Sequence, residues 1–77
     1  MSERAMTKIK RISAKDKKIS IEIHQSKDGY FALQKYVQKY DSEEDVFYEV
    51  RMRPDPSGLF GDIESATEEA RLLLGLE

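Results

Sequence analysis

The residue types that most often carry chemistry are scarce in this sequence, which has one histidine and no cysteine. His24 alternates with Glu22 in the segment KISIEIHQ, so both side chains would lie on one face of a strand. Alternate residues on a strand face stand roughly 7 Å apart, and we therefore expect no direct hydrogen bond between the two. A single histidine without a partner does not make a catalytic site, and we predict no catalytic residues and no enzymatic activity.

Two other segments have ligand-binding residue types without the required spacing. The run DSEED at residues 41–45 is acidic, but it lacks the regular ligand positions and the glycine of a calcium-binding loop. Gly58 and Gly61 match neither a phosphate-binding loop nor a dinucleotide-binding motif. We expect a solvated turn at residues 41–45, no metal, no cofactor and no small-molecule site.

Aromatic and arginine side chains are the remaining candidates. All four tyrosines and two of the three phenylalanines lie between Gly29 and Arg53. Tyrosine and arginine are enriched among the residues that dominate binding energy at protein interfaces. Which rings enter a core and which stay at the surface depends on the strands that carry them.

The segment ISIEIHQ at residues 19–25 alternates apolar and polar residues, which is typical of a half-buried strand. SKDGY at residues 26–30 has the chemistry of a type I turn closed by a glycine in the left-handed region. In such a hairpin Ser26 opposes Tyr30, and a one-residue slip would mix the two faces. This register collects one set of apolar side chains on the inner face: Ile19, Ile21, Ile23, Phe31, Leu33 and Val37.

Residues 31–40 also fit the apolar spacing of a helix. We predict a strand, because the segment is rich in aromatic and β-branched residues, follows a hairpin turn and has no capping residue. A four-residue loop at residues 42–45 would then lead into VFYEVRMR, with Val37 opposite Val50 and Tyr48 on the inner face. A short first strand, from about residue 8 to residue 13, precedes the others.

Two prolines and a glycine in PDPSG, at residues 54–58, end the sheet, because proline cannot donate to a ladder. Ser65 with Glu68 forms a capping box that predicts a helix ending at Gly75. One apolar stripe of this helix can close over the inner face of the sheet: Ala66, Ala70, Leu73 and Leu74.

The predicted fold is α+β: an antiparallel β-meander of three or four strands with one C-terminal helix packed on one face. We expect a single domain over residues 1–77, with residues 1–5 as a disordered tail. The order of elements resembles the three-strand-plus-helix layout of AP2-type and integrase-type DNA-binding domains, whose sheet contacts DNA. The resemblance is one of layout without a shared motif.

One helix covers one face, so the outer rings are either solvated or in contact with a partner. The register places Tyr36 beside Arg51 and Tyr40 beside Phe47, and we expect Arg51 to lie over the Tyr36 ring. Such cross-strand pairs could serve only the sheet, at roughly 0.2–1 kcal/mol each, or they could mark an interaction site. The predicted partner-binding residues are Tyr36, Tyr40, Phe47, Arg51 and Arg53.

Charge divides the chain into two halves. Residues 1–40 carry ten Lys and Arg against four Asp and Glu, and residues 41–77 carry three against eleven. Our first hypothesis is a non-enzymatic interaction module that binds a protein partner or a second copy of itself. The alternative is nucleic-acid binding by the same face together with the basic half. That alternative would use Lys8, Lys10, Arg11, Lys17, Lys18 and Tyr30.

No apolar run approaches the roughly 20 residues that span a bilayer. The first residues have charge but no apolar segment behind them, so they do not read as a secretory signal. We predict a cytoplasmic protein without a membrane partner.

Overall fold

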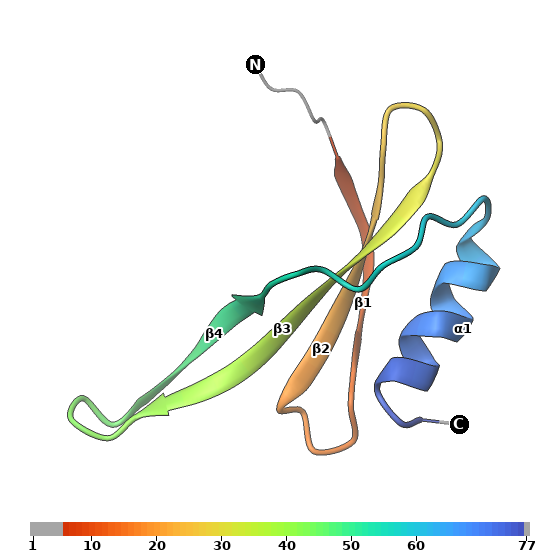
Figure 1. Cartoon of the computed structure of the whole chain (residues 1–77). Helices are drawn as coiled ribbons and strands as arrows, with labels where there is room; N and C mark the ends of the chain where they lie inside the picture. The colour runs from red at the N-terminus through yellow and green to blue at the C-terminus, as the bar shows by residue number, and fades with distance from the viewer. Residues whose placement is uncertain (1–5, 77) are drawn as a thin grey trace.

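The computed structural model describes residues 6–76 and has one antiparallel sheet with one helix packed on it (Figure 1). The four strands lie in chain order, each hydrogen-bonded to the next. This is the predicted α+β meander. The tail predicted at residues 1–5 lies outside the described residues. The elements are β1 (Thr7–Ser13), β2 (Ile19–Gln25), β3 (Phe31–Asp41), β4 (Val46–Met52) and α1 (Ile63–Leu73).

The β2–β3 hairpin has the predicted register, with Ile21 opposite Lys35. Its turn closes through a hydrogen bond from Ser26 N–H to the Tyr30 carbonyl, at 2.8 Å. Gly29 has φ 93°, the left-handed conformation that glycine adopts without a steric cost. Turn chemistry therefore fixes the register, and the register fixes which side chains face the helix.

The β3–β4 hairpin confirms that residues 31–40 form a strand, and it pairs Val37 with Val50 as expected. Its four-residue turn closes with a hydrogen bond from Asp45 N–H to the Asp41 carbonyl, at 2.7 Å. Asp45 has φ 57°, a conformation that aspartate tolerates better than most residues. β3 runs on past its last pairing with β2, at Val37, so the end of this hairpin projects from the sheet (Figure 1).

The helix begins earlier than predicted. Asp62, not Ser65, is the N-cap: its carboxylate accepts a hydrogen bond from Ser65 N–H at 2.7 Å. The helix therefore starts at Ile63, two residues before the predicted cap. Asp and Ser are about equally good caps, so residue type alone does not distinguish Asp62 from Ser65. At the other end Gly75 has φ 72° directly after the C-cap residue, as the predicted glycine stop requires.

The core is small and lies between α1 and the two central strands, β2 and β3. Partly buried side chains close its edges, among them Phe31 and Phe60, whose backbones form a two-bond bridge at 2.9 Å in each direction. That bridge brings the chain back along β3 and sets the helix over β2 and β3. The fully buried side chains are Ile21, Ile23, Leu33, Ala66 and Ala70.

The inner face of β4 is not covered by the helix, contrary to expectation. Tyr48 lies on that face, as the register requires, but it stays 48% exposed. Leu73, predicted to close over the sheet, is 46% exposed. The reason is geometric: α1 packs on β2 and β3, whereas the β3–β4 hairpin leaves the sheet in a direction away from the helix (Figure 1).

Candidate interaction surface

Glu22 is the centre of a polar network on the outer face of the sheet. Its buried carboxylate contacts Arg11 Nη1 at 2.9 Å, His24 Nε2 at 3.0 Å and Lys8 Nζ at 3.7 Å. The expectation that His24 and Glu22 lie too far apart to bond is wrong. The spacing between alternate residues holds for their backbones, but two long side chains can lean together and close that gap.

The network determines the charge of Glu22. Burial by itself raises the pKa of this carboxyl, but the hydrogen bond from His24 and the charges of Lys8 and Arg11 together lower it below its usual range. Glu22 is therefore ionised at neutral pH. The side chains of Lys8 and Arg11, both on β1, point toward it across the outer face.

Arg11 joins three strands of the outer face. Its guanidinium bonds Glu22 on β2 and Glu49 on β4, and it lies over the Tyr36 ring of β3, 5.5 Å from the ring centre. The predicted cation–π partner of Tyr36, Arg51, is therefore not the one found. Strand pairing does not predict Arg11 as the partner of the Tyr36 ring, because pairing considers only adjacent strands and Arg11 reaches from β1 across β2 to β3.

Arg51 instead binds the loop that follows β4. Its Nε and Nη2 donate to the two carboxylate oxygens of Asp55, at 3.1 and 2.6 Å. This forked contact raises the pKa of Arg51, chiefly through the hydrogen bond to Asp55. Tyr36 is half-buried beside these groups and donates its hydroxyl to Gln34 Oε1 at 2.9 Å. Both residues thus have contacts within the fold.

Tyr40 and Phe47 are exposed, unlike the predicted contact residues Tyr36 and Arg51. They face each other across β3 and β4 as predicted, with ring centres 5.0 Å apart. Tyr40 is 51% and Phe47 65% exposed. We call residues 39–48 the β3–β4 arm, because this part of the hairpin extends past the end of β2 (Figure 1). The arm presents apolar side chains on both faces, since Val46 and Tyr48 are exposed on the inner side.

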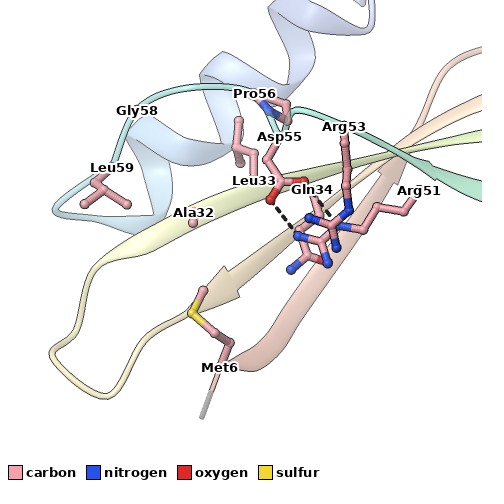
Figure 2. A pocket seen from close by; sticks show the side chains of 10 residues that line it. All are labelled: Met6, Ala32, Leu33, Gln34, Arg51, Arg53, Asp55, Pro56, Gly58 and Leu59. Carbon is pink, nitrogen blue, oxygen red and sulfur yellow. Dashed lines mark hydrogen bonds and ion pairs between the residues drawn. The ribbon is translucent and has the colours of Figure 1, made fainter. Parts of the chain in front are cut away.

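A hollow of about 680 Å³ opens beside β3, where residues 53–59 loop away from residues 32–34. Figure 2 shows Arg51, Arg53 and Asp55 gathered together in its lining, away from Leu59. Arg53 makes no side-chain hydrogen bond or ion pair within residues 6–76. No sequence pattern predicts this hollow, because it depends on the chain returning to pair Phe60 with Phe31. Its lining is Met6, Ala32, Leu33, Gln34, Arg51, Arg53, Asp55, Pro56, Gly58 and Leu59.

The residues of the nucleic-acid alternative do not form one surface. Lys10 pairs with Ile23 on the inner face, whereas Lys8 and Arg11 lie on the outer face and are bound to Glu22. Lys17 and Lys18 belong to the β1–β2 turn, while Tyr30 closes the β2–β3 turn at the opposite end of the sheet. The basic residues are thus distributed over both faces and both ends.

Residues 6–76 contain neither a candidate metal site nor a candidate membrane-spanning helix. No group of three or more His, Cys, Asp or Glu in that range lies close enough to hold a metal ion. In the same range, no helix has the length and apolar character to cross a membrane.

Comparisons of the chain with protein-family models, with curated proteins and with solved structures find no match.

Proposed function

We propose that this chain is a non-enzymatic interaction module, and that it binds a protein partner through the β3–β4 arm and the rest of β4, with Phe47 and the paired Tyr40 ring among the contacting residues. The observation that carries the proposal is the exposure of these two paired rings on an arm that α1 does not reach. Large aromatic side chains bury much apolar area when a partner covers them.

Stabilisation of the sheet by the two rings does not explain why the arm exposes so many apolar side chains. An aromatic cross-strand pair contributes roughly 0.2–1 kcal/mol to a sheet, and Tyr40 with Phe47 would supply this on one face only. Val46 and Tyr48 add exposed apolar area on the other face, where neither contacts the core. Contiguous exposed apolar surface of this kind marks interaction sites in soluble proteins.

Charge around the rings favours a protein over a nucleic acid. The Tyr40 hydroxyl donates to Asp45, and Asp41, Glu43 and Glu44 lie in the same turn. Four carboxylates beside the rings would repel a phosphate backbone. The partner surface that suits the arm is instead apolar with a basic rim. Within the predicted set, Tyr36 and Arg51 hold the face in shape, and Arg53 is available to the partner.

Site-specific photo-cross-linking tests the proposal. A benzoylphenylalanine placed at Phe47 should form a protein adduct in extract from the source cells. The same group at Tyr30 is the matched control, because Tyr30 is also an exposed ring, 51%, at the other end of the sheet. Equal adducts at both positions, or none at Phe47, would contradict the proposal. A nuclease-sensitive adduct at Tyr30 would instead support the nucleic-acid alternative.

A further inference from the structure

The outer edge of β4 has backbone groups without a strand partner in residues 6–76, because β4 pairs there with β3 and no other strand. Gln38 N–H donates toward β2, and Phe31 N–H donates to the opposite side of β3, where β4 lies. Successive residues of a strand direct their N–H and C=O groups to alternate sides. The odd-numbered residues of β3 therefore bond to β4, where their partners have even numbers, such as Val50 opposite Val37. The odd-numbered residues of β4 then direct their N–H and C=O groups to its open edge, and these are Phe47, Glu49 and Arg51.

The two edges of the sheet differ in their protection against strand addition. β1 has a bulge at Ile9 and lysines at positions 8 and 10, and such features hinder pairing with another strand. β4 has no proline, glycine or bulge from Val46 to Met52. It is also flanked by exposed apolar side chains on both faces. An edge of this kind is a template for an added strand.

We propose that β4 pairs with β4 of a second copy of this chain, antiparallel and about a two-fold axis at Val50, so that the two sheets become one. The proposal rests on the proposed function and names its partner. Symmetry makes every contact away from the axis occur twice. Val50 meets Val50 of the second copy, Tyr48 meets Met52, and Glu49 meets Arg51.

The charge pattern of β4 complements itself in this register. Glu49 and Arg51 flank Val50, so reversal about Val50 places a carboxylate opposite a guanidinium at two positions. Opposite charges across a sheet stabilise it, and like charges directly opposite destabilise it. Phe47 of one copy falls opposite Arg53 of the other, whose guanidinium can lie over the ring. A strand from an unrelated protein would not require this symmetric pattern, which is why we infer a second copy.

The neighbouring registers lose these contacts. An axis at Glu49 sets two carboxylates directly opposite each other. An axis at Tyr48 would pair Arg51 with Asp45 of the second copy. Asp45 cannot extend the strand, because its φ is 57° and its N–H is bonded inside the turn. Pairing of one strand per copy is a small interface, so we expect a dimer that dissociates on dilution.

A single introduced cysteine tests the register directly, because the chain has no native cysteine. Val50 binds β3 through its backbone, so the Val50 pair at the axis is of the non-hydrogen-bonded type. Such pairs have Cα atoms about 4.5 Å apart, within the roughly 4.4–6.8 Å that a disulfide allows. Under mild oxidation of the full chain, Val50→Cys should form a disulfide dimer on the order of tenfold or more faster than Ser57→Cys, an exposed loop control.

Each outcome of the oxidation decides the proposal. Fast cross-linking of Val50→Cys, with slow cross-linking of Glu49→Cys and Tyr48→Cys, supports it. Preferred cross-linking at Glu49 or Tyr48, or a rate for Val50→Cys equal to that of the loop control, overturns it. If Val50→Cys fails while position 47 cross-links to a different protein, the second-copy inference is wrong and the proposed function stands. If position 47 gives no adduct either, both are wrong.

Charge exchange provides a second readout by sedimentation. Glu49→Arg and Arg51→Glu should each weaken the dimer, because each puts like charges opposite each other. The double variant should restore it, although it does not restore the contacts of Glu49 with Arg11 or of Arg51 with Asp55 within one copy. Failure of the double variant to recover would contradict the pairing of positions 49 and 51.

Discussion

Glu22 is the residue on which the outer face depends most, since Lys8, Arg11 and His24 all contact its buried carboxylate. Replacing it with glutamine removes the carboxylate paired with Lys8 and one of the two carboxylates paired with Arg11. We predict that Glu22→Gln lowers the free energy of unfolding at neutral pH by about 1.5–3 kcal/mol, the range for a hydrogen bond to a charged group. Urea denaturation measures this. Glu43→Gln, in the exposed turn, is the control and should have no effect.

The same carboxylate makes stability depend on pH. Its pKa is lowered on folding from an ordinary value of 4.5, so the ionised form stabilises the fold above that value. This contribution is lost as the pH falls through the lowered pKa of the folded state. The stability difference between the wild type and Glu22→Gln should therefore shrink on acidification below about pH 4.5. A difference that stays constant down to the acid transition would show that the network contributes no charge effect.

Ile21 is fully buried in the core, whereas Ile9, on β1, is 42% exposed. Ile21→Ala should cost about 2–4 kcal/mol of unfolding free energy, as large-to-small core changes do. A domain of this size has a total stability of only roughly 4–11 kcal/mol, so the variant should be close to unfolding at 37 °C. Ile9→Ala removes the same atoms from the surface and should change stability by less than about 0.5 kcal/mol. Equal losses would contradict the placement of the core.

At the scale of elements, local chemistry predicted the two hairpins well. The turn SKDGY fixed the β2–β3 register, and the alternation of apolar residues fixed which face it buries. Tertiary contacts decided what local chemistry could not. The helix cap is Asp62 rather than Ser65, and Leu73 is exposed because α1, which follows the Phe31–Phe60 pair, lies over β2 and β3.

The cap assignment can be checked by a pair of alanine variants. Asp62→Ala removes the acceptor of the Ser65 N–H hydrogen bond and should lower the melting temperature by a few degrees. Ser65→Ala keeps that backbone donor and should have a smaller effect. Melting curves followed by circular dichroism compare the two. A larger loss for Ser65→Ala would restore the cap predicted from the sequence.

At the scale of the whole molecule, the chain is a thin body of 43 × 37 × 19 Å. Its smallest dimension fits one sheet with one helix layer, so in the described part of the chain the outer face has no second layer over it. The rings that sequence patterns assign to that face differ in exposure according to their position along the strands. Tyr36 lies under Arg11, while Tyr40 and Phe47 project on the arm. Strand alternation predicts the face of a residue, but the length of a hairpin beyond its neighbours determines its exposure.

The central claim is that the β3–β4 arm and its open β4 edge are the contact surface, with a second copy of the chain as the inferred occupant. An NMR dilution series of amide chemical shifts tests this most directly, because it reports every backbone position at once. We predict that the amides of Phe47, Glu49 and Arg51 shift progressively with concentration, while those of α1 do not. Shifts confined to α1 or to the β1–β2 turn, or no shift at any concentration, would contradict self-association through β4.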